Sequence, residues 1–383
     1  MKRPFFLSKI KQQFRVHPVC ALLGPRQAGK TTLARQFGAE YERQQVHYFD
    51  LEIAEDWGAL QQPLHTLSQL RGLIVIDEIQ RLPELFPTLR VLADRNEAHF
   101  LILGSASRDL IKQSSETLAG RIGYIELPPF SLFEEGTEQQ SLLTRGGFPR
   151  SYLAELETDS FLWRSAYIQT FLERDIPQLG FSIPAITLKR FWMMLTYVHG
   201  QLLNRQALAT SMGISSHNVS HYLDILAGTF MMRLLPPWFE NIKKRQTKTP
   251  KLYFRDSGIL LNLLGIKDHQ ALLHYPHLGA IWEGYALEQI IQAYHAAPEE
   301  IFFWRTQQGA ELDLLVFKDQ QRIGFEFKFT EKPSVSKSMH IAIEDLKLDQ
   351  LLLIYPGQRD IQLTSRITAK GLTNVVRNLQ NEQ

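Results

Sequence analysis

The residues of this 383-residue sequence with the clearest chemical purpose form a glycine-rich run near the amino terminus. The apolar run Val19–Leu23 leads directly into the spacing Gly-x-x-x-x-Gly-Lys-Thr at residues 24–31. Glycines let successive backbone N–H groups converge on a phosphate, and a helix that begins there directs its positive end at the same anion. Lys30 is then expected to contact the β- and γ-phosphates of ATP, and the Thr31 hydroxyl a Mg²⁺ ion. The predicted nucleotide-binding residues of this run are Gly24, Pro25, Arg26, Gln27, Ala28, Gly29, Lys30, Thr31 and Thr32.

A second pair of candidates ends another apolar run. Leu73–Ile76 is followed by Asp77 and Glu78, as when a buried central strand delivers carboxylates to one edge of a sheet. Asp77 suits a Mg²⁺ position together with Thr31, and Glu78 suits the base that polarises the water attacking the γ-phosphate. A solvated acidic turn is the alternative. The two carboxylates favour hydrolysis over transfer of the phosphoryl group to a small molecule.

Two more residues are candidates because of their places beside the next strands. Ser105 follows the apolar run Phe100–Leu103, where its hydroxyl could sense the γ-phosphate, although a turn-forming serine fits equally well. Arg121 precedes a further strand and could reach the nucleotide of a neighbouring subunit as an arginine finger. A surface salt bridge is the alternative for Arg121. The finger interpretation requires a homo-oligomer.

The elements that must position these residues alternate between short apolar runs and helical patterns over residues 18–130. This alternation is typical of an α/β fold in which helices cover a parallel sheet. The expected strands are Val19–Leu23, Val46–Phe49, Leu73–Ile76, Phe100–Leu103 and Gly123–Glu126.

The middle of the chain is mostly helical in pattern, and Leu203–Leu226 has the layout of a helix-turn-helix. Gly213 lies in the turn, where a left-handed backbone is easiest for glycine. The second helix is expected to direct Asn218 and His221 outward, toward a groove of DNA. Neither is Lys or Arg, so the common guanine contact is missing. The residues expected to face inward are Leu203, Ala207, Leu208, Val219, Tyr222, Leu223 and Leu226.

A basic loop follows this helix pair. Met231–Leu235 and Lys251–Phe254 are predicted strands, and the loop between them is rich in Lys and Arg. Such a loop is typical of the wing of a winged helix, which contacts DNA phosphates with little dependence on sequence. The alternative is a solvated hairpin on a domain that binds protein or only packs. The predicted wing contacts to DNA are Lys243, Lys244, Arg245 and Lys248.

The carboxyl-terminal part of the chain changes to a helix, three strands, a helix and a strand. A hairpin turn at residues 318–321 places Asp313 opposite Glu326, on one face of the hairpin. Two facing carboxylates repel each other unless a cation lies between them. The alternative is a charged surface hairpin in which Glu311 pairs with Lys328. The expected elements are the helix 280–294, the strands 301–305, 311–317 and 322–329, the helix 341–348 and the strand 351–355.

This hairpin, preceded by a helix that carries Glu283, is similar to the core of the PD-(D/E)XK nuclease superfamily. The resemblance implies that Asp313 and Glu326 hold Mg²⁺ or Mn²⁺, with Glu283 near that site. It also implies that Lys328 orients the attacking water or stabilises the charge of the transition state. Glu288 is a rival for the role of Glu283, but five residues along a helix turn it onto another face. An ATP-gated, Mg²⁺-dependent DNA nuclease is therefore one alternative function.

Motifs spread over nearly the whole chain resemble those of a large group of prokaryotic predicted AAA+-type ATPases, whose members carry a carboxyl-terminal domain of unknown function numbered 4143. The resemblance implies an ATP-binding and ATP-hydrolysing protein. Arg174, in one of these motifs, could be a lid arginine near the nucleotide or part of a structural ion-pair cluster. The motifs are residues 24–31, 48–50, 76–80, 104–105, 118–121, 146–149 and 171–176.

Composition narrows the remaining possibilities. Lys and Arg number 42 against 40 Asp and Glu, so the net charge of +2 indicates that any basic surface must be local. The single cysteine, Cys20, excludes an intramolecular disulfide and favours a cytoplasmic protein. No apolar stretch approaches the ~18 residues needed to span a bilayer, so we expect no membrane partner.

The sequence as a whole predicts three domains. They are an AAA+-type P-loop ATPase domain at residues 1–145, a helical lid with a winged helix at 146–265 and a nuclease-like α/β domain at 266–383. ATP and Mg²⁺ are the expected cofactors, and DNA is the expected partner, engaged mostly without regard to sequence. A nucleotide switch whose rear half binds protein partners is a further alternative.

Overall fold

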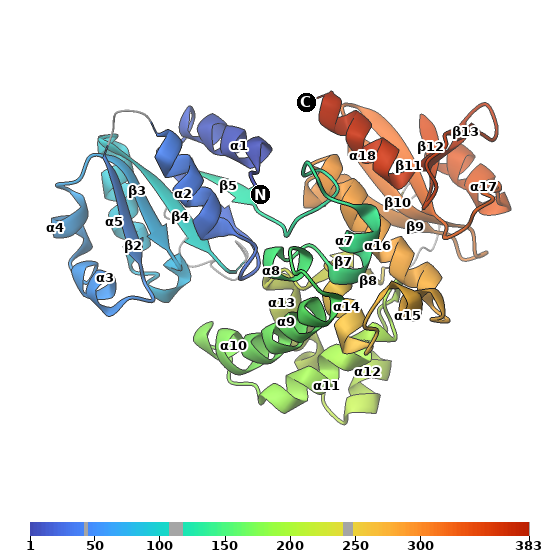
Figure 1. Cartoon of the computed structure of the whole chain (residues 1–383), viewed down its shortest axis with the longest axis horizontal. Helices are drawn as coiled ribbons and strands as arrows, with labels where there is room; N and C mark the ends of the chain where they lie inside the picture. The colour runs from blue at the N-terminus through green and yellow to red at the C-terminus, as the bar shows by residue number, and fades with distance from the viewer. Residues whose placement is uncertain (42–44, 107–117, 240–247, 383) are drawn as a thin grey trace. The chain divides into compact units, whose positions relative to one another are not determined.

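The computed structural model describes residues 1–41, 45–106, 118–239 and 248–382 (Figure 1). These residues form two compact units. The unit boundaries do not coincide with the expected domain boundaries at residues 145 and 265. Within the expected middle domain, residues 171–183 and 224–231 belong to unit 1, and the other residues belong to unit 2. No helix in these described ranges is long and apolar enough to cross a membrane. Unit 1 comprises Met1–Pro129, Phe171–Ile183 and Asp224–Met231, and unit 2 comprises Phe130–Thr170, Pro184–Leu223 and Met232–Gln383.

Unit 1 is built around a sheet of five parallel strands in the order β2-β3-β4-β1-β5. All five strands expected from the sequence are present, which confirms the predicted α/β architecture with a parallel sheet. The central strands β3, β4 and β1 are apolar except for His99 near the start of β4 and Asp77 at the end of β3, as expected for strands that are covered on both faces. The strands are β1 (Val19–Leu23), β2 (Val46–Asp50), β3 (Gly72–Asp77), β4 (Ala98–Gly104) and β5 (Ile122–Glu126).

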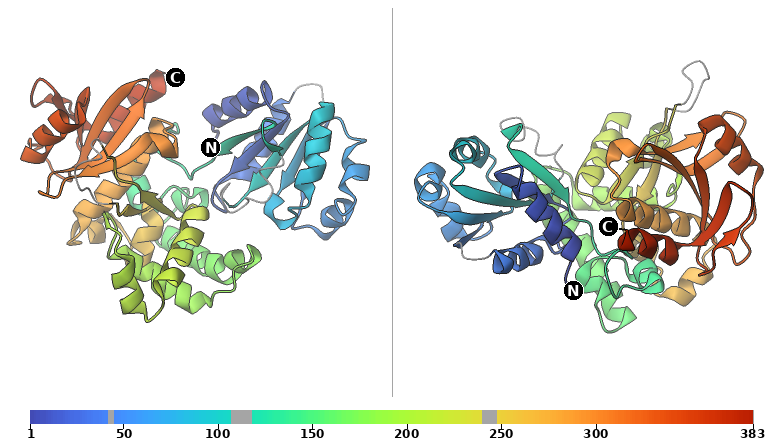
Figure 2. Two further views of the ribbon diagram at one scale, coloured as in Figure 1. Left: turned by 180° about the vertical axis from the view of Figure 1, so that it is seen from behind. Right: turned by 90° about the horizontal axis from the view of Figure 1, so that it is seen from above.

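Helices lie over the two faces of this sheet (Figure 1 and Figure 2), and a hydrophobic core lies on each face. One core contains Ile10 of α1, Phe37 of α2 and Cys20 of β1. The other contains Leu89 of α5 and Ile74 of β3. Successive strand residues enter opposite cores because side chains alternate along a strand. The remaining elements of unit 1 are α1 (Pro4–Phe14), α2 (Lys30–Glu40), α3 (Ala54–Ala59), α4 (Pro63–Leu67), η1 (Ile79–Arg81), α5 (Leu85–Arg95), the π-helical turn η3 (Phe171–Asp175) and α10 (Ile176–Gln178).

Unit 2 begins with helices and a small antiparallel sheet in the order β6-β8-β7. The predicted helix-turn-helix is present as α12 and α13, and Gly213 ends α12 with a left-handed φ of 67°. Its expected inward-facing residues are buried except Ala207, which is exposed; Ala209 is buried instead, because it shares a helix face with Met212. These elements are α7 (Gln139–Arg145), α8 (Pro149–Tyr152), α9 (Glu157–Thr170), α11 (Ala185–Thr196), β6 (Gln201–Leu202), α12 (Arg205–Met212), α13 (Ser216–Gly228), β7 (Met232–Leu235), β8 (Lys251–Phe254), α14 (Ser257–Leu263) and α15 (His269–Leu273).

The larger sheet of unit 2 has the order β13-β14-β12-β11-β10-β9. β9, β10 and β11 are antiparallel neighbours, whereas β12 runs parallel to β11 and β14. A helix precedes β9 and another follows β11, in the predicted order. α17 begins four residues before the predicted helix because Ser336 caps it, accepting a hydrogen bond from the Met339 N–H at 3.3 Å. The elements are α16 (Leu278–Ala293), η4 (Pro298–Glu300), β9 (Ile301–Arg305), β10 (Glu311–Lys318), β11 (Gln321–Phe327), α17 (Lys337–Leu346), β12 (Gln350–Tyr355), β13 (Ile361–Gln362), β14 (Ile367–Gly371) and α18 (Leu372–Asn381).

The β10–β11 hairpin has the predicted register. Lys318 pairs with Gln321, and Leu314 pairs with Phe325. The two turn residues, Asp319 and Gln320, have φ values of 49° and 65°, as a tight two-residue hairpin turn requires. This register directs Asp313 and Glu326 to the same part of the sheet.

Candidate active site

The glycine-rich loop, residues 24–31, joins β1 to α2 at the carboxyl edge of the parallel sheet. Gly29 has a φ of 96°, which glycine adopts without strain, and α2 begins at Lys30. Gly24 leaves no space for a side chain, because a Cβ there would overlap the carbonyl oxygen of Leu127. The loop therefore brings the positive end of α2 to this edge of the sheet. Of the other predicted residues in the run, Ala28 is buried, and Gln27 and Thr32 are exposed.

Lys30 is buried within this loop. Its Nζ donates hydrogen bonds to the carbonyl oxygens of Gly24 and Pro25, each at 2.9 Å. Burial lowers the pKa of the Lys30 amine, whereas the Glu78 and Asp77 carboxylates favour its charged form. The amine thus lies over the loop, where it can contact the terminal phosphates of a nucleotide.

Thr31 and Asp77 form the expected pair. The Thr31 Oγ1 donates a hydrogen bond to Asp77 Oδ2 at 2.6 Å. Asp77 is buried at the end of β3, where burial raises the pKa of its carboxyl and the Thr31 hydrogen bond lowers it. Hydroxyl and carboxylate oxygens are the ligands that Mg²⁺ prefers at nucleotide sites. The two side chains therefore fit the Mg²⁺ ion that the glycine-rich motif implies.

Glu78 lies beside this pair in a small polar network. Its backbone has a φ of 54°, and its N–H donates a hydrogen bond to Asp77 Oδ1 at 2.9 Å. Its Oε2 accepts hydrogen bonds from the Gln80 amide and from the Ser105 Oγ, the latter at 3.2 Å. Gln80 also donates to Ser105 Oγ at 2.8 Å. The structure thus brings the predicted residues Glu78 and Ser105 together. Gln80 was not predicted as a site residue. Its position in the sequence, two residues after Glu78, could have indicated that its side chain lies near the Glu78 carboxylate.

Arg26, another residue of the loop, contacts acidic side chains. Its guanidinium pairs with Glu52 and Asp175, and Arg174 also pairs with Glu52, at 3.2 Å. Arg174 and Asp175 belong to η3, and π-helical turns are frequent at functional sites. Arg174 therefore takes part in an ion-pair cluster, the second of its two interpretations, and that cluster includes the loop residue Arg26.

Arg121 lies at the opposite edge of the sheet from the glycine-rich loop. β5 is parallel to β1, and Ile122 pairs with Val19, so the residue before β5 lies at the amino-terminal edge. Arg121 pairs with the exposed Asp94 at 2.5 and 3.1 Å. The structure therefore does not bring Arg121 to the phosphate loop of its own chain, and it favours the salt-bridge interpretation.

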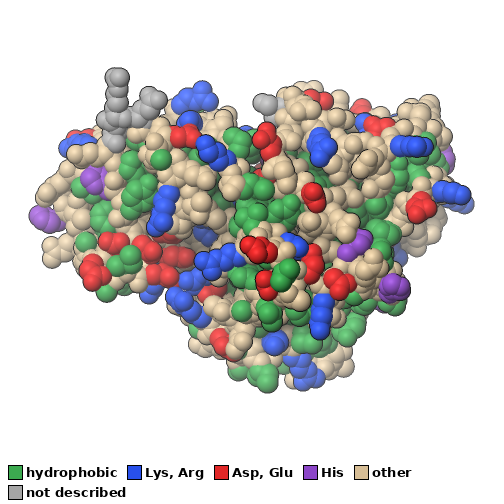
Figure 3. Space-filling model, viewed as in Figure 1, with side chains coloured by type: hydrophobic (Ala, Val, Ile, Leu, Met, Phe, Trp, Pro, Cys, Tyr) green, Lys and Arg blue, Asp and Glu red, His purple; other side chains and the backbone are tan. Residues whose placement is uncertain are grey.

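The helix pair of unit 2 exposes the residues that we expect to face DNA. Asn218 and His221 are exposed on α13, and Lys248 is exposed shortly before β8. Residues 243–245, the other predicted wing contacts, lie outside the described residues. Lys and Arg side chains are interspersed with Asp and Glu across the face of the molecule shown in Figure 3, in agreement with the small net charge.

Glu283 of α16, Asp313 of β10 and Glu326 of β11 belong to a carboxylate cluster in unit 2, in which Asp313 and Glu326 are buried and Glu283 is partly buried. Burial and then the Asp313 carboxylate raise the pKa of Glu326 to about 8 and that of Glu283 to about 7. Lys328 pairs with Glu326, at 3.2 Å, and not with Glu311 as the surface-hairpin alternative predicted. The structure thus brings together the residues that the nuclease resemblance selected.

A lysine that sequence reasoning missed lies within this cluster. The Lys251 Nζ is 3.3 Å from Glu283 Oε1 and 3.6 Å from Asp313 Oδ1, and it also pairs with Glu311. Within the described ranges, no set of three or more His, Cys, Asp and Glu side chains is arranged to hold a metal ion. The metal centre expected at Glu283, Asp313 and Glu326 stays a prediction, and a metal ion there would have to compete with the Lys251 amine for the same oxygens.

Glu288, the rival of Glu283, has separate partners. It is buried, and its carboxylate pairs with Arg233 at 2.9 Å and with Arg255 at 3.6 Å. These guanidinium groups satisfy the buried charge, so Glu288 reads as a structural residue of α16.

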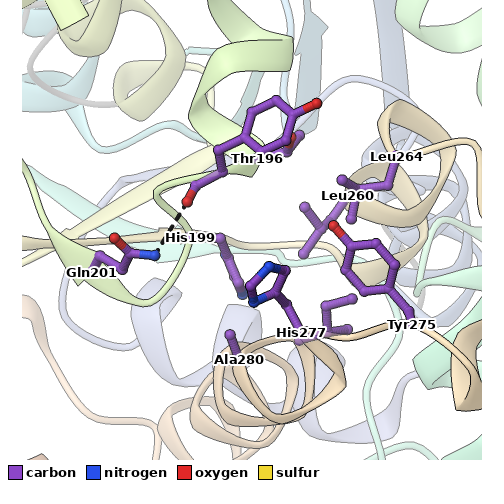
Figure 4. Close-up of a pocket in the computed structure, with 10 residues that line it drawn as sticks. Thr196, His199, Gln201, Leu260, Leu264, Tyr275, His277 and Ala280 are labelled. Atoms are coloured by element: carbon purple, nitrogen blue, oxygen red, sulfur yellow. Dashed lines mark hydrogen bonds between the residues drawn. The ribbon is translucent and has the colours of Figure 1, made fainter. Parts of the chain in front are cut away.

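A separate, small hollow lies between α11, α14 and α16 (Figure 4). Its lining includes Tyr275, His277 and the buried His199. The His199 Nδ1 accepts a hydrogen bond from the Phe254 N–H at 3.1 Å, and burial lowers the pKa of its imidazole to about 4. His199 is therefore neutral near pH 7, and none of the predicted site residues lines this hollow.

Three family models match successive parts of the chain. An AAA domain matches residues 16–135, a domain of unknown function (DUF8612) matches residues 137–270, and another (DUF4143) matches residues 278–375. The AAA match covers the parallel sheet together with Lys30, Asp77 and Glu78.

Two mycobacterial proteins are similar over most of their length. The chain is 47% identical over 365 residues to the uncharacterized protein Rv2008c of Mycobacterium tuberculosis and to the uncharacterized protein Mb2031c of Mycobacterium bovis. Each alignment covers 94% of this chain and 82% of the relative.

Two solved structures are also similar to parts of this chain. The Walker-type ATPase PABY2304 of Pyrococcus abyssi is 15% identical, with 69% of this chain and 95% of that chain covered and a TM-score of 0.46. The RuvB Holliday junction branch migration motor of Thermotoga maritima is 20% identical, with 61% and 88% covered and a TM-score of 0.31.

Proposed function

This chain belongs to the family of its two mycobacterial relatives, with an AAA domain ahead of DUF4143, and from that premise we propose that it binds and hydrolyses ATP. The observation that carries the proposal is the convergence of Lys30, the Thr31–Asp77 pair and Glu78 at one edge of the sheet. Lys30 and Thr31 follow the apolar run of β1, and Asp77 and Glu78 end the apolar run of β3, so two runs deliver these four residues to the same edge.

In this proposal each side chain has a separate task. Lys30 contacts the γ-phosphate and stabilises the negative charge that spreads over its oxygens during bond cleavage. Thr31 and Asp77 would hold Mg²⁺, which neutralises charge on the β- and γ-phosphates. Glu78 orients the attacking water and accepts its proton, and the hydrogen bonds from Gln80 and Ser105 keep its carboxylate in place.

Phosphate release from ATP by the purified full-length chain tests this proposal. We expect turnover that requires Mg²⁺, stops when EDTA is added and saturates with ATP concentration. Binding of ATP measured by calorimetry separates a slow enzyme from a protein without a nucleotide site. A chain that neither releases phosphate nor binds ATP would exclude the proposed function.

We further infer that unit 2 engages DNA, mostly through phosphates. The specific support is the order of its elements, in which α11, β6, α12, α13, β7 and β8 follow the plan of a winged helix. Asn218 and His221 are exposed on the second helix of the pair, and Lys248 precedes the last strand. Because neither exposed residue on the helix is Lys or Arg, affinity would come from the basic loop and would depend weakly on sequence.

Neutralising Lys243, Lys244 and Arg245 together is expected to weaken binding to every DNA sequence tested. Each phosphate contact contributes about 0.9 to the slope of log K against log salt, so the slope should decrease by about 2–3. Fluorescence anisotropy over a salt series measures this change. The matched control removes three exposed basic residues from elsewhere in unit 2, namely Lys332, Lys337 and Arg377.

An unchanged salt slope in the wing variant would place the DNA surface elsewhere. ATP turnover with single-stranded, duplex and branched DNA provides a second readout. Turnover that is indifferent to all three would favour the alternative in which unit 2 binds protein partners.

A further inference from the structure

The acidic cluster of unit 2 contains a cation supplied by the chain itself. Lys251 opens β8, where it pairs with Leu235 of β7 and Leu202 of β6. Its side chain is only 4% exposed, although it belongs to a residue type that is almost never fully buried without partners. Because β8 is the central strand of the small sheet, the backbone of Lys251 is fixed on both sides, and this limits where its ammonium group can lie.

The ammonium contacts three carboxylates that come from two other elements. Glu283 projects from α16, and Glu311 and Asp313 come from β10. Tyr253, two residues along β8, donates its hydroxyl to Glu283 Oε1 at 2.6 Å. β8 therefore supplies both a positive charge and a hydrogen-bond donor to the same carboxylate.

Two further oxygens of the cluster also have partners. Asp313 Oδ2 accepts the backbone N–H of Phe327 at 3.1 Å, and Glu326 pairs with Lys328. Burial by itself lowers the pKa of the Lys251 amine, but Tyr253, Glu283 and Asp313 together raise it well above its ordinary value. The amine is thus charged throughout the physiological range of pH.

A divalent ion could not share these oxygens with the ammonium. Mg²⁺ needs oxygen ligands at about 2.0–2.1 Å in a nearly octahedral arrangement. Here the oxygens of Glu283 and Asp313 are directed to one Nζ, at 3.3 and 3.6 Å. Two cations placed among the same buried carboxylates would also repel each other.

We propose that the Lys251 ammonium is the resident cation of this carboxylate cluster, in the place that a divalent ion would otherwise take. The larger sheet of unit 2 then binds no metal and cleaves no phosphodiester bond, although its elements follow the order typical of PD-(D/E)XK nucleases. This inference is independent of ATP hydrolysis in unit 1.

Manganese binding by the full-length, nucleotide-free protein tests the proposal. The background for all variants is Asp77→Asn, which removes the carboxylate that would hold Mg²⁺ with Thr31 at the nucleotide site. We expect no Mn²⁺ binding that depends on Asp313 in this background, as measured by the paramagnetic resonance signal of unbound Mn²⁺. Lys251→Met retains an unbranched side chain of similar length without the charge. It should create an Asp313-dependent Mn²⁺ site with an affinity about tenfold or more above any Mn²⁺ binding by the Asp77→Asn parent. Adding Asp313→Asn should abolish that gain.

The matched control is Lys248→Met, which removes an exposed lysine three positions before Lys251 and should leave Mn²⁺ binding unchanged. Asp313-dependent Mn²⁺ binding before Lys251 is changed would overturn the proposal, as would a folded Lys251→Met variant that binds no Mn²⁺. If Lys251→Met does not fold in metal-free buffer, Mn²⁺ should restore its near-ultraviolet circular dichroism. A variant that stays unfolded with and without Mn²⁺ also counts against a replaceable cation.

Discussion

Replacing Lys30 with alanine is expected to lower the rate of ATP hydrolysis by about 10³-fold and to weaken ATP binding. The γ-phosphate loses the cation nearest to it, in a site where burial strengthens the interaction. The loop also loses the two hydrogen bonds that the amine makes to the Gly24 and Pro25 carbonyls. Phosphate release and calorimetric titration with ATP measure the two effects separately.

The control for this change is Arg35→Ala, which removes an exposed cation from the same helix, α2. Arg35→Ala should hydrolyse ATP at nearly the parental rate. This outcome would show that the effect of Lys30→Ala does not come from the loss of any positive charge on α2. A Lys30→Ala variant within twofold of the parental rate would show that the loop is not the catalytic phosphate site.

Replacing Glu78 with glutamine is expected to separate binding from turnover. The glutamine has the same shape and leaves Lys30, Thr31 and Asp77 in place, so ATP should bind with nearly parental affinity. Hydrolysis should fall by about 10²–10⁴-fold, because an amide cannot accept the proton of the attacking water. A single-turnover measurement with bound ATP tests the chemical step directly.

Glu84→Gln is the matched control, since Glu84 is an exposed carboxylate a few residues further along the chain. If Glu78→Gln hydrolyses ATP at the parental rate, the base lies elsewhere. If Glu78→Gln instead fails to bind ATP, Glu78 has a structural task in the loop, and its assignment as the base is wrong.

The residues at the carboxyl edge of the parallel sheet of unit 1 could be predicted because each follows an apolar run that is visible in the local sequence. Each apolar run fixes a strand, and the residues that follow the run must lie at the carboxyl edge of a parallel sheet. The same rule of direction applies to Arg121, which precedes its strand and therefore lies at the amino-terminal edge of its own subunit. A contact of Arg121 with the nucleotide of a neighbouring subunit stays a prediction.

The carboxylate cluster shows what the sequence could not provide. The hairpin register followed from the turn, and it placed Asp313 and Glu326 correctly relative to each other. Lys251 carries no local signal, because it reaches Glu283 only through the packing of β8 against α16, far along the chain. Reading an acidic cluster as a metal site requires knowledge of every cation nearby, and that knowledge comes from tertiary structure.

Two segments from later in the chain complete unit 1, and they determine whether the AAA part can be transferred to another protein as one piece. Phe171–Ile183 brings Asp175 to Arg26, and Asp224–Met231 adds Phe230 to a core of the sheet. The chain passes from one unit to the other after residues 129, 170, 183, 223 and 231. A fragment cut at Pro129 would lack part of its own core, and a chimera that transplants the nucleotide site must carry all three segments. A single recombination event within the gene would therefore not transfer a complete AAA part from one protein to another.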